Sequence, residues 1–180
     1  MVWVLDPEHT QVGFAAQHLM VATVHGRFTR FDADIALDPE QPERSHVTAR
    51  IDAASLSTGN EERDRHLRSA AFLDVDRFPH IEFHSTQVAQ VGPDSFWLRG
   101  NLSIHGVTHE VTLRGRFDGS VETLADAPAV RFQMAAEVNR DDFDLTWNSA
   151  LDAVGILVGR AITITIDAAV RQPDRAPITD

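Results

Sequence analysis

The sequence predicts an all-β fold, in which about eight antiparallel strands form a barrel or a sandwich and one short helix lies in a connection. Three observations predict this class. Apolar residues recur at every second position over most of the chain, turn-forming residues separate these segments, and one charged stretch is helical in character. Strands of this number and spacing are typical of a sandwich or of a closed barrel, which is filled by side chains or holds one ligand.

The alternation of apolar and polar side chains is the pattern of strands with one buried face. It is clearest in residues 31–37, 47–51, 130–138 and 162–168. A weaker example, residues 12–18, predicts that His18 points inward. Phe28 is out of phase with Phe31, so we expect a β-bulge near Arg30.

One pair of strands can be tested for register. Residues 96–104 and 107–117 both alternate, and His105-Gly106 between them suits a two-residue turn. With that turn, Leu98 lies opposite Leu113, and nearly every apolar residue of the hairpin lies on one side. A slip of one residue would destroy this match, so the register is well determined.

Residues 57–69 depart from the strand pattern and predict a short helix. Thr58 and Glu61 have the spacing of a capping box, in which each side chain bonds a backbone N–H at the start of the helix. The acidic residues come early and the basic ones late, which complements the helix dipole. Leu67 and Phe72 are the expected anchors to the sheet.

Breaks between the strands are marked by polar, glycine and proline residues. We expect a polar loop at 38–43, a tight turn at 92–94, a longer loop at 118–128 and an apolar irregular stretch at 141–159. No linker divides the chain, so residues 1–170 are expected to form one domain. Residues 171–180 carry two prolines and few apolar residues and predict a flexible tail.

The composition excludes several classes of function. Asp plus Glu number 27 against 16 Lys plus Arg, for a net charge of −11, and such a surface repels nucleic-acid phosphates. The absence of cysteine excludes disulfides, thiol catalysis and cysteine-ligated metals. No apolar run is long enough to cross a membrane, and the first residues do not read as a signal peptide. We therefore expect a cytoplasmic protein with no nucleic-acid partner.

A series of short motifs lies in a fixed order along the chain. They occupy residues 3–14 with His18, 26–31, 51–58, 63–69, 78–86, 100–108 and 139–143. In number, order and spacing these motifs resemble those of the YceI-like family of polyisoprenoid-binding proteins over nearly the whole length. One departure is Asp144, because the family usually has glycine after the phenylalanine of the last motif.

The resemblance implies a lipocalin-like antiparallel β-barrel with an elongated apolar cavity for a long-chain lipid, such as a polyprenyl phosphate or a quinone. It implies binding, storage or transport without catalysis and without a required cofactor. The inward apolar set is then the predicted wall: Phe14, Phe28, Phe31, Phe83, Leu102, Ile104, Phe132, Met134, Ile162 and Ile164. From the pattern alone, the same residues could simply fill a core.

An anionic lipid head needs hydrogen-bond donors, and arginine binds phosphate through two parallel bonds. The candidates are Arg63, His66 and Arg140, in the two most polar motifs. Arg63 could instead pin the helix together with Asp64, and Arg140 could close a loop. His18 is a further candidate for ligand contact, with a hydrogen-bonded core histidine as the alternative.

The sequence leaves two functions other than lipid binding to consider. The cluster Arg63-Asp64-Arg65-His66 could serve a hydrolase or isomerase acting on a lipid ester or prenyl substrate, but no G-x-S-x-G elbow occurs, and such charges on a helix are usually solvated. The pairs His80/His84 and His105/His109 lack an H-E-x-x-H context, so no metal site is expected. Analogy with related barrels adds a homodimer as a candidate assembly.

Overall fold

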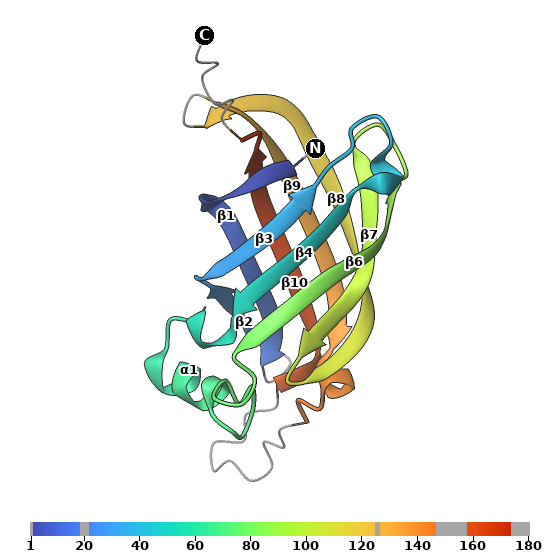
Figure 1. The fold of residues 1–180 in the computed structure, drawn as a ribbon. Coiled ribbons are helices and arrows are strands. Elements are labelled where there is room, and N and C mark those ends of the chain that lie inside the picture. The colour runs from blue at the N-terminus through green and yellow to red at the C-terminus, as the bar shows by residue number, and fades with distance from the viewer. Residues whose placement is uncertain (1, 19–21, 125–126, 147–157, 174–180) are drawn as a thin grey trace.

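The fold is a closed antiparallel β-barrel of eight strands, as the resemblance implied (Figure 1). The structure is a computed structural model that describes the backbone of residues 2–18, 22–124, 127–146 and 158–173, and side chains within 2–17, 22–118, 129–146 and 159–173. The strands of the ring follow the order β1, β3, β4, β6, β7, β8, β9 and β10, and β10 pairs again with β1.

The strands are β1 (Val2–His18), β2 (Ala22–Phe28), β3 (Phe31–Ala36), β4 (His46–Asp52), β5 (Leu56–Ser57), β6 (His80–Gln90), β7 (Ser95–Ile104), β8 (Val107–Leu124), β9 (Ala127–Asn139) and β10 (Val158–Arg171). The helix α1 is Glu61–Arg68, and the 3₁₀ turns are η1 (Pro42–Arg44), η2 (Ala53–Ser55) and η3 (Arg140–Phe143). None of the helices in the described ranges is long and apolar enough to cross a bilayer.

Strand β1 closes the ring and has a different second neighbour along each half. On one side it pairs with β10, with Phe14 opposite Ile164. On the other side its first residues pair with β3, whereas residues 12–18 pair with β2, where Phe14 lies opposite Gly26. The strand β2 therefore leaves the ring, and the connection with η2, β5 and α1 lies beside it.

The two ends of the barrel are formed by different elements. Helix α1 and the turn η3 lie at one end, which we call the α1 end (Figure 1). The connection 37–45 between β3 and β4 and the turn 91–94 between β6 and β7 lie at the opposite end, which we call the loop end.

The predicted hairpin register is confirmed. Leu98 lies opposite Leu113, and Ile104 opposite Val107. His105 and Gly106 have φ angles of 53° and 72°. Two left-handed residues in succession form the type of two-residue turn whose twist matches that of the flanking strands.

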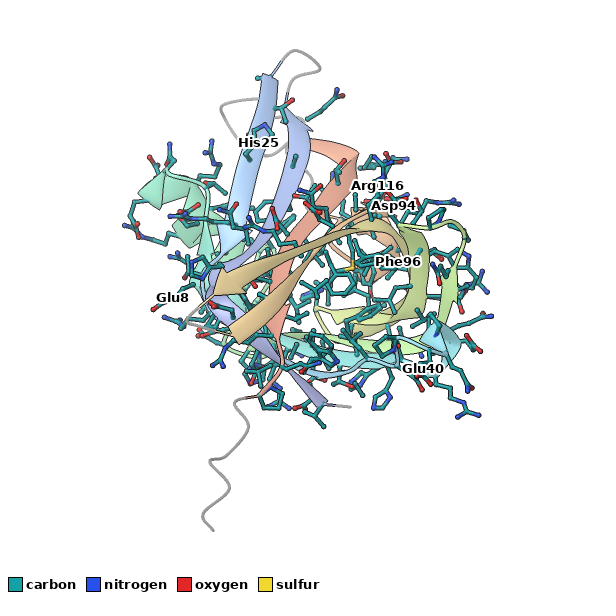
Figure 2. The ribbon with its side chains drawn as sticks, turned by 90° about the horizontal axis from the view of Figure 1, so that it is seen from above. Glu8, His25, Glu40, Asp94, Phe96 and Arg116 are labelled. Carbon is teal, nitrogen blue, oxygen red and sulfur yellow. The ribbon has the colours of Figure 1, made fainter. Side chains whose placement is uncertain are left out.

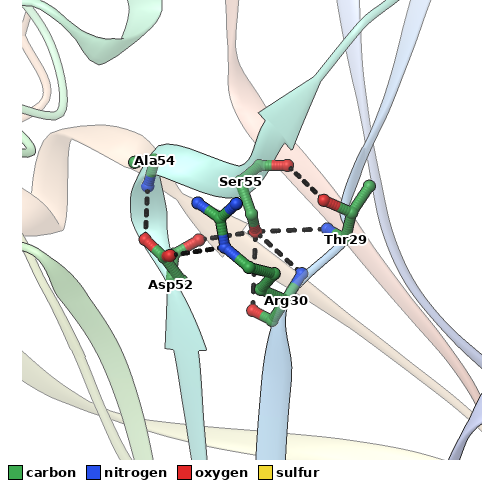
Figure 3. A network of polar contacts seen from close by, with 5 residues as sticks. All are labelled: Thr29, Arg30, Asp52, Ala54 and Ser55. Atoms are coloured by element: carbon green, nitrogen blue, oxygen red, sulfur yellow. Dashed lines mark hydrogen bonds and ion pairs between the residues drawn. The ribbon is translucent and has the colours of Figure 1, made fainter.

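The irregularity predicted at Arg30 is a break between strands rather than a bulge. β2 ends at Phe28 and β3 begins at Phe31. The Ser55 hydroxyl accepts hydrogen bonds from the backbone N–H groups of Thr29 and Arg30, both at 3.1 Å, and donates to the Asp52 carbonyl at 2.7 Å (Figure 3). These bonds satisfy backbone donors that a continuous ladder would have satisfied.

The capping box predicted for the helix is wrong. Asn60 is the N-cap, and its side chain accepts a hydrogen bond from the Arg63 N–H at 3.0 Å. Thr58 bonds instead to Asp64, which is 3% exposed: its N–H donates at 2.9 Å and its hydroxyl at 2.5 Å. The buried carboxylate therefore holds the start of α1 against the preceding chain.

The prediction of a longer loop at 118–128 is also wrong, because β8 and β9 continue through most of this stretch. Thr123 pairs with Pro128 and Leu124 with Ala127, after an irregularity between Asp118 and Glu122. Pairing with a neighbouring strand thus overrides the turn-forming composition of this stretch.

The apolar stretch 141–159 lies only partly within the described residues. Its first part completes η3, with Phe143 and Leu145 buried, and its last part begins β10. Asp144 has a φ angle of 55°, a left-handed conformation that glycine adopts freely and that aspartate tolerates better than most residues. The expected tail begins with Arg171, which ends β10, and residues 174–180 lie outside the described chain.

Asp52 makes the stability of the barrel depend on pH. The hydrogen bond from the Arg30 guanidinium, 2.8 Å long, is the main reason that the pKa of Asp52 lies below its usual value. A lowered pKa contributes stability above the unfolded pKa, about 3.9, that is lost as the pH falls through the folded pKa. We expect Asp52→Asn to lower the free energy of unfolding by up to about 1 kcal/mol at neutral pH.

Urea unfolding of both proteins at neutral and strongly acidic pH checks this prediction. The difference in the free energy of unfolding between wild type and Asp52→Asn should shrink in acid. Asp34→Asn, at an exposed position of β3, serves as the control. A difference of equal size at both pH values would contradict the role given to the carboxylate.

Asp64 should be far more important for stability than other acids of the same connection. Replacing it with alanine leaves the N–H and hydroxyl of Thr58 without their acceptor, which should cost about 2–3 kcal/mol. Asp76→Ala is the matched control, because Asp76 is exposed. Chemical denaturation measures both variants, and equal stabilities would show that the buried carboxylate does not hold the helix.

Candidate functional site

The barrel is hollow. It encloses a cavity of about 950 Å³, lined by residues from every strand of the ring and from α1. The lining extends from Asp38 and Ser45 at the loop end to Arg63 and Arg140 at the α1 end. The cavity therefore runs along the barrel and is large for a small-molecule site.

The wall of the cavity is apolar because every second residue of a strand faces inward. All ten predicted wall residues line it, namely Phe14, Phe28, Phe31, Phe83, Leu102, Ile104, Phe132, Met134, Ile162 and Ile164. Several of these, such as Met134 and Ile164, are only half-buried although they point inward. Figure 2 shows Phe96, another wall residue, inside the ring of strands. These side chains surround a space and do not fill a core.

Other wall residues were not identified from the sequence. Trp3 and Leu5 line the loop end, and Leu56 and Leu73 come from the connection around α1. The alternation of Trp3 with Leu5 is a signal, but it is interrupted where β1 loses its register with β10 after Asp6. The residues of the connection follow no strand period, so alternation could not reveal them.

The polar lining differs between the two ends. Among the described lining residues, the basic side chains Arg63, His66 and Arg140 all lie at the α1 end. The loop end carries Asp38 and neutral polar groups such as that of Ser45. The basic side chains of the lining thus gather at the α1 end, where the acidic Glu62 also lines the cavity, and a further acid, Asp32 of β3, lines it as well.

Arg63 both pins the helix and lines the cavity. Its Nε donates to the Thr58 hydroxyl at 2.8 Å and its Nη2 donates to the Thr58 carbonyl at 3.0 Å. These bonds fix the guanidinium at the wall, next to the buried Asp64. His66 lies one helical turn later and lines the same cavity.

Arg140 is buried, at 8% exposure, and holds the chain at η3. Its Nε donates to the Gly159 carbonyl at 3.2 Å, and its Nη1 donates to the Leu145 carbonyl. The Asp141 Oδ1 atom lies 3.7 Å from the Arg140 Nη1 atom. Closing the chain around η3 therefore accounts for these contacts of Arg140, while the residue also borders the cavity.

The side chain of His18 lies outside the described residues, so its predicted contact with a ligand stays a prediction. Its backbone belongs to β1, opposite Ala22 of β2 and Val158 of β10. The pairing of β1 with β10 shifts just before it, after Ala16.

The charged cluster of α1 does not converge on one point. Arg63 and His66 line the cavity, Asp64 is buried against Thr58, and Arg65 is exposed. Within the described chain, no three His, Asp or Glu side chains are grouped as metal ligands. His105, from one of the histidine pairs, lies 3.3 Å from the Phe143 carbonyl through its Nδ1.

Solved structures share this fold. Burkholderia cenocepacia BcnA has a TM-score of 0.81 at 19% identity, over 92% of this chain and 98% of that one. A polyisoprenoid binding domain from Saccharophagus degradans, implicated in plant cell wall breakdown, has a TM-score of 0.68 at 13% identity, over 95% and 98%.

Curated relatives are more similar in sequence. A UPF0312 protein of Enterobacter sp. (strain 638) is 36% identical over 141 residues, which are 78% of this chain and 73% of the relative. Protein YceI of Salmonella newport is 35% identical with the same coverage. The sequence profile of the YceI-like domain matches residues 3–170. The chain therefore belongs to the YceI-like family.

Proposed function

We propose that this protein binds a long apolar lipid, a polyisoprenoid, inside the barrel and stores or carries it without chemical change. The observation that carries the proposal is the hollow apolar cavity of about 950 Å³. A polyisoprenoid has no hydrogen-bonding groups along its chain, so a wall of branched and aromatic side chains suits it. The name of the Saccharophagus degradans domain supports the same class of ligand.

The size of the cavity sets the length of chain that it can hold. If each non-hydrogen atom takes the roughly 30 Å³ that a water molecule takes in the liquid, the volume holds about 30 atoms, or about six isoprene units. At about 0.3 kcal/mol per atom, such a ligand binds with about 9 kcal/mol, which corresponds to a dissociation constant below about 1 μM.

Binding accounts for the polar residues better than catalysis does. A hydrolase or isomerase needs its acid, base and nucleophile within reach of one reacting atom. In α1, Asp64 is bonded to Thr58 and Arg65 is exposed. Glu62, Arg63 and His66 remain at the wall, but Glu62 is largely exposed to solvent and Arg63 is bonded to Thr58. Two hydrogen-bond donors beside an apolar cavity suit a head group, and we propose that an anionic head lies at the α1 end.

One test of the proposed function concerns the ligand that the protein carries after purification. Extraction with organic solvent should release a long apolar molecule, and native mass spectrometry should show its mass bound to the folded protein. The same spectrum counts the subunits and so tests the expected homodimer. Protein that carries no lipid and takes up no added prenol would contradict the proposed function.

Another test concerns the recognition of the lipid head group by Arg63. Arg63→Gln keeps a donor for Thr58 and removes the charge, so affinity for a prenyl phosphate should fall about tenfold or more, because hydrogen bonds to charged groups contribute roughly 1.5–3 kcal/mol. Affinity for the uncharged prenol should be unchanged. Arg65→Gln, on the exposed side of the same helix, is the control. Equal losses for both ligands would show that Arg63 does not recognise the head.

A further inference from the structure

Aromatic rings lie over glycines on the inner face of the barrel. Within the described side chains the pairs are Gly26 with Phe14, Gly100 with Phe83, and Gly115 with Phe96. A Cβ atom built on any of these glycines would lie less than 3 Å from the ring, well inside the 3.5–4 Å of a normal carbon contact. Each ring therefore occupies the space that a side chain on the facing strand would fill.

The pair of Gly26 and Phe14 follows from the strand register. The two residues lie directly opposite each other in β2 and β1. Opposite side chains of an antiparallel pair share one face and contact each other. Because Gly26 has no side chain, the Phe14 ring folds down over its backbone, and the Phe28 ring packs beside it with centroids 5.6 Å apart.

Gly26 is the position of the three where the nearest atoms to the built Cβ all belong to the ring. The three nearest atoms to its built Cβ are Cζ, Cε1 and Cε2 of Phe14, at 2.1, 2.6 and 2.7 Å. At Gly100 the nearest atom to the built Cβ is the backbone oxygen of His84, at 2.4 Å, and at Gly115 the Gln133 carbonyl oxygen lies at 2.9 Å. A methyl group at position 26 can therefore be accommodated by moving one side chain.

The displaced ring would move into the cavity. Phe14 lines the cavity, whereas Gly26 lies behind the ring and does not. Phe28 packs on one side of Phe14, and Ile164 of β10 lies opposite it on the other. The open side is the interior of the barrel.

Phe14 lies partway along the cavity. In strand β1, Trp3 lies opposite Ile35 near the loop end and His18 lies at the α1 end, with Phe14 between these residues. A ring that projected into the cavity at this level would separate the α1 end, with Arg63, from the apolar part beyond.

We infer that Gly26 is a specificity-determining residue, because it seats the Phe14 ring against the wall and so lets a long chain pass along the whole cavity. The inference rests on the proposed function. It predicts an effect that depends on chain length: a short prenyl chain fits on one side of the displaced ring, whereas a long chain has to pass it.

Binding of farnesol and of the longer hexaprenol to wild type, Gly26→Ala and Gly92→Ala tests this inference. Gly92 lies in the turn between β6 and β7, where a built Cβ meets Ser95 at an ordinary 3.6 Å, so its variant controls for the loss of a glycine. Hexaprenol should bind Gly26→Ala at least about tenfold more weakly than wild type, since leaving even about two CH₂ groups unburied lowers affinity by that factor. Farnesol should bind all three proteins alike.

A double variant, Gly26→Ala with Phe14→Leu, separates the ring from other effects. Gly26→Ala alone should melt at a lower temperature than wild type, because the methyl group displaces the ring from the wall. With the ring removed, hexaprenol binding and the melting temperature should return toward those of wild type. A Gly26→Ala protein that binds hexaprenol as Gly92→Ala does would overturn the inference, as would a double variant whose hexaprenol binding does not recover. Failure of wild type to bind either prenol would contradict the proposed function instead.

Discussion

The whole structure depends on the hydrogen-bonded closure of β10 onto β1. Without this pairing the eight strands would form an open sheet with two free edges, and the inward apolar face would be exposed to water. Closure turns the face into a wall around a space that the side chains do not fill. The cavity is thus a consequence of topology, and single side chains adjust its width and polarity.

Much of the barrel could be predicted from the sequence because its strands keep a strict period of two. The hairpin of β7 and β8 was predicted to the residue, since a slip would have moved Leu98 and Leu113 to the wrong face. The break at Arg30 was located through the phase of Phe28 and Phe31, but its nature depends on Ser55, a residue far along the chain. Local periodicity carries no information about such a partner.

The wrong predictions, of a capping box and of a long loop, have the same cause: they depend on partners that are distant in the sequence. Thr58 and Glu61 have the spacing of a capping box, yet the hydroxyl of Thr58 bonds to Asp64, whose burial only the packing of α1 determines. The stretch 118–128 has the composition of a loop, yet the neighbouring strand pairs with it. For the candidate site, alternation found ten of the strand residues of the wall, but not Trp3 and Leu5, where β1 loses its register with β10. It missed Leu56 and Leu73, because the connection around α1 has no strand period.

That connection also makes the wall of the barrel uneven in strength. Residues 53–79 contribute several lining side chains, but the ladder holds them to β2 only through Arg27 with Ser57 and Phe28 with Leu56. A backbone hydrogen bond from the Thr29 N–H to the Ser55 carbonyl, at 3.3 Å, and bonds of the Ser55 and Asp64 side chains add to these two pairs. A segment that few bonds hold to its neighbours opens locally at a lower free energy than the paired strands of a sheet. Amide hydrogen exchange should therefore be faster in residues 53–79 than in the strands of the ring. The ring would remain closed while this segment opens.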